Sequence, residues 1–283
     1  MAEVLVTGGT GTLGSRVVAA LGQSGHGVRV LSRRDVSPAG DGGPNGVRRV
    51  EGDLGSGAGL GEAVAGVEAI VHCASATGTL RRRTQRAVDV EGTRRLAAAA
   101  RAAGSPRLLY PSIVGIDELP FSYYRAKRAA EAEVAHSDLP WAIVRATQFH
   151  DLILGALRAL DRGPVLILPR AFRLQPVDAG EVADRLVELL EEGATGRARD
   201  FGGPQELSAH ELGALYRNAK DRPRMRLVNV PVPGRTARAV RAGSLLCPGG
   251  AAGRVSFADF LGRHRATPAD RTRPGARSGD PPP

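Results

Sequence analysis

The chain opens with Val4-Leu5-Val6-Thr7, and Gly8-Gly9-Thr10-Gly11-Thr12-Leu13-Gly14 follows directly. The apolar start predicts a buried parallel strand, and residues 15–21 predict the helix after it. Glycines in such a turn let a pyrophosphate approach the backbone, and the helix N-terminus offers free N–H groups to it. A turn without a ligand is the alternative, but the strand and helix that the motif requires are both present. We expect a dinucleotide to be held here by Gly8, Thr10, Gly11, Thr12, Leu13 and Gly14.

Strands and helices alternate through the first half of the chain, which predicts an α/β fold of the Rossmann type with a doubly wound parallel sheet. Further strands are expected at 28–31, 48–53, 69–73, 107–110 and 141–145, with helices at 85–103 and from Ser122, the expected N-cap. We divide the chain into a dinucleotide-binding core (1–147), a small substrate-binding cap interwoven with the core (148–262), and a disordered tail (263–283). In the cap we expect an extended piece at 165–168 and helices at 180–191 and 208–219.

The composition of the chain limits which partners and binding sites we expect. The net charge is +10, carried almost entirely by arginine, since Lys127 and Lys220 are the two lysines. The arginines form no long run and few aromatics interleave with them, so we expect no nucleic-acid partner and interpret the charge as compositional bias. No apolar run reaches about 18 residues, and the N-terminus enters a strand directly, so we expect no membrane span, no signal peptide and a cytoplasmic protein. Cys73, Cys247 and the scattered histidines predict no metal site.

The choice between NAD and NADP is made just after the second strand. NAD-binding proteins usually place an acid there, whereas an arginine suits the 2′-phosphate of NADP. This strand is followed by Arg33 and Arg34, which favour NADP(H), although two solvated arginines near Asp35 are the alternative. Asp53, at the end of the third strand and followed by Leu54, is expected to accept from the adenine amino group or to cap the next helix. After the fourth strand, the small residues Ala74 and Ser75 let the backbone pass close to the cofactor.

Tyr123 and Lys127 are four residues apart on one predicted helix and therefore share a face. A cation there lowers the pKa of the tyrosine and favours a proton donor that works near neutral pH. Ser112, just beyond the fifth strand, is placed to hydrogen-bond a substrate carbonyl. Tyr216 and Lys220 repeat the spacing, but no strand-end serine precedes them, and we interpret them as solvated helix-face residues.

Together these motifs resemble the short-chain dehydrogenase/reductase superfamily, and more closely its extended or atypical, NmrA-like NAD(P)-binding branch. The segment Asp89-Val90-Glu91-Gly92-Thr93 is similar to a helix motif of that branch that usually begins with Asn. The resemblance covers roughly residues 3 to 262 and also includes Ile143 to Phe149, Gln175 to Asp178 and Glu181 to Ala183. It implies Tyr123 as proton donor, Lys127 as the residue that binds the nicotinamide ribose and tunes Tyr123, and Ser112 as the residue that orients the substrate.

These features predict an NADPH-dependent oxidoreductase that reduces a small carbonyl, quinone or enone substrate. Two alternatives stay open: a non-catalytic NADP-sensing regulator, and a sugar-nucleotide epimerase or dehydratase, which needs a basic and aromatic cap. The cap has arginines at 158, 162, 170 and 173 but few aromatics. We expect a monomer or homodimer.

Overall fold

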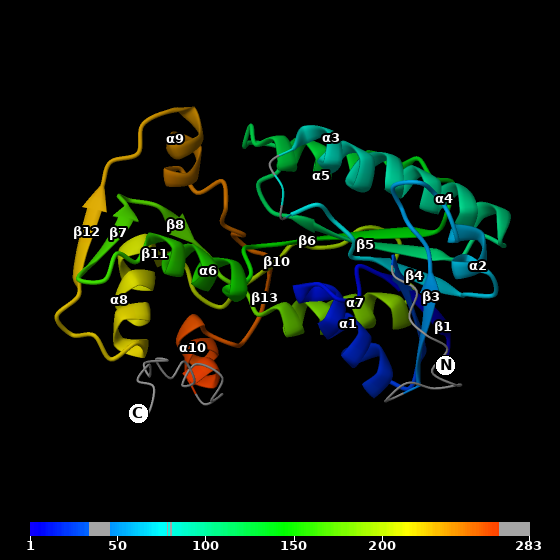
Figure 1. The fold of residues 1–283 in the computed structure, drawn as a ribbon, viewed down its shortest axis with the longest axis horizontal. Coiled ribbons are helices and arrows are strands. Elements are labelled where there is room, and N and C mark those ends of the chain that lie inside the picture. The colour runs from blue at the N-terminus through cyan, green and yellow to red at the C-terminus, as the bar shows by residue number, and fades with distance from the viewer. Residues whose placement is uncertain (34–45, 78, 80, 266–283) are drawn as a thin grey trace, which may run out of the picture.

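The computed structural model describes residues 1–33, 46–77, 79 and 81–265. A sheet of nine strands forms its centre, in the order β13-β10-β6-β5-β4-β1-β2-β3 with β9 beside β6 (Figure 1). Every pairing in this sheet is parallel. The strands are β1 (Glu3–Thr7), β2 (Gly27–Ser32), β3 (Val47–Glu51), β4 (Ala69–His72), β5 (Arg107–Ile113), β6 (Trp141–Ala146), β9 (Gly196–Arg197), β10 (Phe201–Gly202) and β13 (Ala251–Ala252). The predicted doubly wound parallel sheet is confirmed.

The strand order reverses between β1 and β4. The chain first builds outward from β1 through β2 to β3, and then crosses back to place β4 on the other side of β1. The helices that follow β1 and β4, α1 (Thr12–Gln23) and α4 (Gly92–Ala102), therefore cover opposite faces of the sheet. Ligands of open α/β folds bind at such a reversal.

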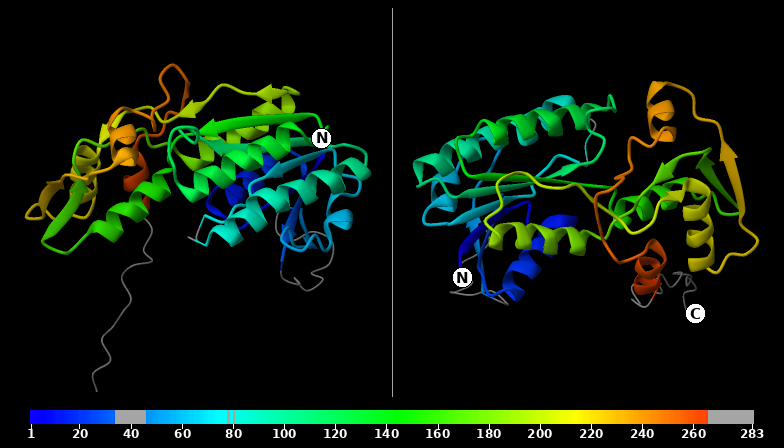
Figure 2. Two further views of the ribbon diagram at one scale, coloured as in Figure 1. Left: turned by 90° about the horizontal axis from the view of Figure 1, so that it is seen from above. Right: turned by 180° about the vertical axis from the view of Figure 1, so that it is seen from behind.

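Helices cover both faces of the sheet (Figures 1 and 2). One face packs against α1 (Thr12–Gln23) and α7 (Ala179–Glu191). The other packs against α2 (Leu60–Val64), α4 (Gly92–Ala102) and α5 (Ser122–Ala135). Strand β1 shows why both faces are apolar: Val4 and Val6 enter the α1/α7 core, while Leu5 enters the other one. A buried parallel strand needs apolar side chains on both sides.

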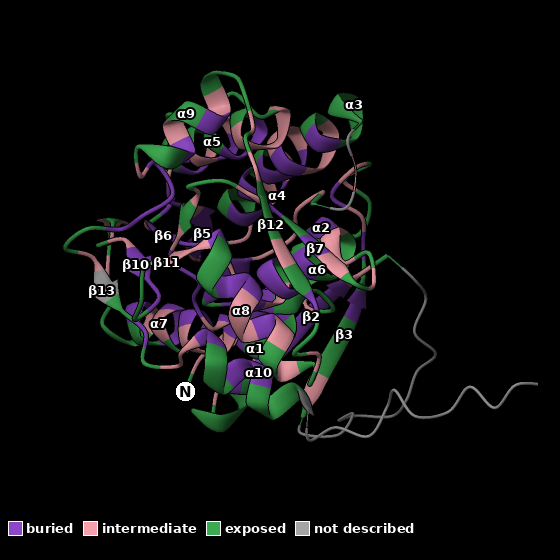
Figure 3. Cartoon of the chain, turned by 90° about the vertical axis from the view of Figure 1, so that its left-hand side faces the viewer, coloured by how far each residue is buried: buried purple, intermediate pink, exposed green. Residues whose placement is uncertain are grey.

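A smaller cap lies beyond the end of the sheet. Its elements are α6 (His150–Leu160), β7 (Val165–Pro169), β8 (Arg173–Leu174), β11 (Leu207–Ser208), α8 (Ala209–Ala219), β12 (Arg226–Val230), α9 (Arg235–Arg241) and α10 (Phe257–Arg265). It has an apolar cluster of its own in which α6, β7, α8 and α10 meet, and their inward faces are buried in Figure 3. Between cap segments the chain returns to the core as α7, β9, β10 and β13.

Several sequence expectations shift at element ends. Ser122 is not an N-cap, because Phe121 takes that position and no side chain caps the helix. Strand β3 ends at Glu51, so Asp53 lies in the following turn, whereas β5 continues to Ile113 and includes Ser112. The expected helix at 85–103 is part of a longer one: α3 (Arg82–Gln85) and a π-helical segment η1 (Arg86–Glu91) lead into α4.

The chain end differs in a similar way. Helix α10 runs to Arg265, three residues into the segment expected as a tail, and residues 266–283 lie outside the described part. Among the helices that the structure describes, none combines the length and apolar character needed to cross a bilayer.

Candidate active site

The glycine loop lies between β1 and α1 at the carboxyl edge of the sheet. Gly8 has φ +68°, and a Cβ there would lie 2.6 Å from the backbone N of Ala74. At Gly14 a Cβ would lie 2.1 Å from the carbonyl oxygen of Gly8, so neither position accepts another residue. At Gly11, by contrast, a Cβ would meet that same oxygen alone, at 3.3 Å. Gly8 and Gly14 thus allow the close backbone contacts of the loop, whereas Gly11 leaves space on the exposed side of the loop.

This loop fits the pyrophosphate of a dinucleotide. Thr10, Gly11 and Thr12 are exposed, and α1 begins after Gly11 without any side-chain cap. The first N–H groups of α1 are therefore not satisfied by a protein side chain and face the loop. Leu13 differs from its expected neighbours, because its side chain is buried in the α1/α7 core. Only its backbone is available to a cofactor.

The ends of β2 and β3 are followed by the residues expected to contact the adenosine half of the cofactor. Arg33 is exposed directly after β2, and Arg34 lies outside the described residues. The Asp53 carboxylate accepts hydrogen bonds from the N–H groups of Gly55 (3.1 Å) and Ser56 (3.0 Å), which hold its pKa below the usual range. It therefore closes a turn and does not cap α2. Leu54 is buried beneath it in the second core.

A series of hydrogen bonds connects the loop after β4 to the end of β1. The N–H of Ala74 donates to Thr7 Oγ1 (3.2 Å), which lies 2.6 Å from His72 Nδ1. His72 Nε2 lies 2.9 Å from Thr93 Oγ1, and Thr93 donates to the carbonyl of Asp89 at 2.5 Å. Because the Thr93 proton goes to Asp89, His72 must donate from Nε2 and accept at Nδ1. The neutral ring is thus fully paired, and burial lowers its pKa to about 3.

Tyr123 is held by the same loop. Its hydroxyl lies 3.1 Å from Ser75 Oγ, and Ser75 in turn donates to a carboxylate oxygen of Asp89. Burial raises the pKa of Tyr123 well above its usual range, and the charge of Asp89 adds to the rise. The expectation that the pKa of Tyr123 is lowered is therefore wrong.

Lys127 explains that difference, because its ammonium contacts other groups. Nζ donates to the carbonyl of Pro111 at 2.9 Å and sits 4.0 Å from the centre of the Tyr110 ring. The side chain is buried, and this burial lowers the pKa of Lys127 to about 8. Ser112, next to Pro111, is also buried, and its Oγ has no hydrogen-bond partner among the described residues. The structure thus brings Lys127 to the β5 end beside Ser112 and Tyr123 to the β4 end beside Ser75.

The second tyrosine–lysine pair has a different environment from the one expected. Tyr216 is not solvated: it is 2% exposed in the cap core, and its hydroxyl donates to Asp161 at 3.1 Å. Lys220 is the exposed C-cap of α8. A cavity of about 410 Å³ also lies in the cap, lined by 163–164 and 221–225, and it contains none of the expected site residues.

Comparison with known proteins decides the family. The sequence model of a family described as NAD(P)H-binding matches residues 8–193, which include the glycine loop and strands β2 to β6. The chain belongs to this NAD(P)H-binding family.

Two curated relatives are reductases. The chain is 32% identical over 249 residues to the ceramide reductase of Caulobacter vibrioides, covering 82% of this chain and 74% of the relative. It is also 32% identical over 232 residues to (4-alkanoyl-5-oxo-2,5-dihydrofuran-3-yl)methyl phosphate reductase of Streptomyces griseus, covering 78% and 74%. A nucleoside-diphosphate-sugar epimerase of Staphylococcus aureus shares the fold, with TM-score 0.74, 16% identity and coverage of 92% and 99%. This NAD(P)H-binding chain is thus an NAD(P)-dependent enzyme of the oxidoreductase type.

Sequence reasoning missed four residues of the candidate site: Thr7, His72, Thr93 and Tyr110. A signal existed for the first two, because each is a polar residue at the end of an apolar strand, and for Tyr110, which ends the run at 107–110. Thr93 gave no such signal. The roles of Thr93 and Tyr110 depend on which helix packs against which strand.

Proposed function

We propose that this enzyme is an NADP(H)-dependent reductase of a small carbonyl, quinone or enone substrate. The observation that carries the proposal is the half-buried Tyr123 at the carboxyl edge of the sheet, one helical turn from Lys127 and with its hydroxyl 3.1 Å from Ser75 Oγ. Exposed Arg33 after β2 supports NADP over NAD, because a guanidinium binds a 2′-phosphate by charge-assisted hydrogen bonds. Both curated relatives quoted above are named as reductases.

The residues divide the work of a carbonyl reduction. Bound NADPH supplies a hydride to the substrate carbon. As the C=O electron pair moves onto oxygen, Tyr123 gives its hydroxyl proton to that oxygen and becomes a phenolate. Ser112 Oγ, buried and unpaired among the described residues, donates a hydrogen bond to the same oxygen and orients it. The Lys127 ammonium, one helical turn from Tyr123, would hold the nicotinamide ribose.

The proposal is tested by measuring turnover with NADPH on a panel of small carbonyl, quinone and enone compounds. Tyr123→Phe keeps the ring and removes the proton, so we expect turnover to fall by about 10²- to 10⁴-fold while NADPH affinity is nearly unchanged. Lys127→Ala should lower both turnover and NADPH affinity. Tyr216→Phe is the matched control, since it also lies four residues before a lysine but sits in the cap core, and its turnover should stay near wild type.

Three results would change the proposal. Near-normal turnover of Tyr123→Phe would remove its proton-donor role. Tight NADPH binding without turnover on any panel member would favour the sensing protein. Conversion of a sugar nucleotide with no net consumption of cofactor would favour an epimerase or dehydratase.

A further inference from the structure

Three side chains form an unusual series at the candidate site. Tyr123 Oη lies 3.1 Å from Ser75 Oγ, and Ser75 donates to one carboxylate oxygen of Asp89. The other oxygen of Asp89 accepts from the backbone N–H of Ala76 at 3.1 Å. Asp89 is fully buried within the π-helical segment η1. A buried carboxylate thus connects to the proposed proton donor through a single hydroxyl.

The number of available protons fixes the direction of these hydrogen bonds. An ionised carboxylate only accepts, and a serine hydroxyl has one proton to give. Since Ser75 gives that proton to Asp89, its oxygen can only accept from Tyr123. The Tyr123 proton therefore points at Ser75. A hydrogen bond from Ser75 would stabilise the phenolate, but in this arrangement Ser75 has no proton left to donate.

We propose that Asp89 is a positioning residue of the proton donor: by taking the Ser75 proton, it makes Ser75 the acceptor that holds the Tyr123 proton until a substrate oxygen competes for it. The role rests on the proposed reductase function. When Tyr123 gives up its proton, Ser75 keeps its own hydrogen bond to Asp89. No covalent bond other than the Tyr123 O–H changes in this step.

Other titratable groups also face this series. They are Lys127 and Tyr124 from α5, Tyr110 from β5 and Cys73 from the loop after β4. Burial raises the pKa of Cys73 to about 12 and also raises that of Tyr110, so neither ionises near neutral pH. Lys127, with its pKa lowered to about 8 by burial, is the neighbour that a test must separate from Tyr123.

Asp89→Asn reverses the hydrogen bonds without changing the shape of the side chain. The Ala76 N–H only donates, so the amide oxygen of the new residue must face it. The amide NH₂ then faces Ser75 and donates to it, which frees the Ser75 proton for Tyr123. The change also removes the negative charge that opposes a phenolate at Tyr123. Both effects favour the phenolate.

The test is tyrosinate absorbance against pH, because lysine and cysteine side chains do not give this signal and no substrate is needed. The contribution of Tyr123 is the difference between each protein and the same protein carrying Tyr123→Phe. We expect Asp89→Asn to form the Tyr123 phenolate at a pH lower by about one unit or more than wild type. With any confirmed substrate, the alkaline fall of kcat/KM for reduction should move down by the same amount, since reduction needs protonated Tyr123.

A second substitution keeps the proposal falsifiable if Asp89→Asn fails to fold. Ser75→Ala removes the acceptor from protonated Tyr123, so the phenolate should form at lower pH, whereas Ser75→Thr keeps the hydroxyl and should restore the wild-type titration. A phenolate that forms at higher pH in Ser75→Ala would mean that Ser75 donates to Tyr123, and would overturn the proposal. An equally large effect of Asp89→Asn in the Ser75→Ala background would also overturn it, because Asp89 would then act without Ser75. Normal turnover of Tyr123→Phe would instead show that Tyr123 is not the proton donor, and would overturn the role of Asp89 in positioning that donor whatever the titrations show.

Discussion

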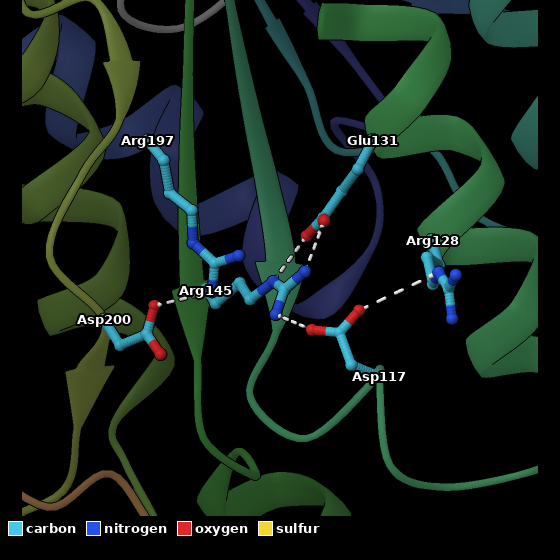
Figure 4. Close-up of polar contacts among 6 residues, drawn as sticks. All are labelled: Asp117, Arg128, Glu131, Arg145, Arg197 and Asp200. Carbon is cyan, nitrogen blue, oxygen red and sulfur yellow. Dashed lines mark hydrogen bonds and ion pairs between the residues drawn. The ribbon is translucent and has the colours of Figure 1, made fainter.

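Arg145 on β6 and Glu131 on α5 form a two-point ion pair across the edge of the core. Arg145 Nε lies 2.8 Å from Glu131 Oε1 and Nη2 lies 2.6 Å from Oε2, with the side chains only 7% and 12% exposed (Figure 4). A further guanidinium nitrogen binds Asp117, in the loop after β5, and the guanidinium of Arg145 holds the pKa of that carboxyl below its usual range. This pair fixes the helix that carries Tyr123 and Lys127 against the sheet.

The pair should be a major contributor to stability. Glu131→Gln removes the charge and one of the two contacts, and leaves the buried guanidinium partly unpaired. We expect the free energy of unfolding to fall by about 3 kcal/mol, measured by denaturant titration. Glu133→Gln is the control on the same helix, because its partner Arg94 is 62% exposed, and it should cost at most about 1 kcal/mol. Equal losses of unfolding free energy in the two variants would show that the burial of Arg145 does not make its ion pair more important for stability than an exposed one.

His72 should make the fold acid-sensitive. Its pKa is about 3 in the folded protein because of burial, against the 6.5 of an ordinary histidine, so the unfolded chain binds the proton more readily. The resulting stability is complete above about pH 6.5 and is lost as pH falls toward about 3. We expect the free energy of unfolding to drop by about 2 kcal/mol between about pH 7 and pH 5, a window in which carboxylates contribute little.

His72→Asn should flatten that slope even if it lowers stability at every pH. An unchanged slope in His72→Asn would assign the acid sensitivity to other groups.

Two glycines of the loop should respond differently to the same change. Gly14→Ala places a Cβ 2.1 Å from the Gly8 carbonyl, so we expect a large loss of thermal stability or no folded protein. Gly11→Ala meets that oxygen at 3.3 Å and should fold nearly normally. Its methyl group fills the space that a pyrophosphate needs, so dinucleotide affinity should fall at least about tenfold. Fluorescence titration with NADPH beside a thermal melt separates the two outcomes, and wild-type affinity in a folded Gly11→Ala protein would contradict the assignment of this loop.

Arg33 should select the 2′-phosphate. A charge-assisted contact is worth about 1.5–3 kcal/mol, so Arg33→Ala should weaken NADPH binding by about 10- to 150-fold and leave NADH binding nearly unchanged. Arg101→Ala, an exposed arginine at the end of α4 that pairs with Asp138, should alter neither affinity. If the wild-type protein binds NADH as tightly as NADPH, Arg33 does not have this role.

The sequence was informative wherever a local pattern has one physical solution. A strand that is apolar on both sides, a glycine loop and a following helix can satisfy their backbone groups and bury their side chains in few ways, so the sheet and the phosphate loop were predictable from residues 4–21. The spacing of Tyr123 and Lys127 likewise placed both on one face of one helix.

The tertiary contacts of individual side chains were not predictable from the sequence. Lys127 was expected to act on Tyr123, but its ammonium binds Pro111 and the Tyr110 ring, and Tyr216 was expected in solvent but fills the cap core. Such contacts join residues that are far apart in the chain, such as Ser75 with Tyr123 and Thr7 with His72.

Residue type and spacing alone therefore determined the sheet, its cofactor loop and the helix with the proposed donor, because these depend on interactions within a few turns or strands. The direction of the hydrogen bonds around Tyr123 was decided only by tertiary packing. It depends on where η1 lies against the loop after β4, since one buried carboxylate there takes the only proton of Ser75.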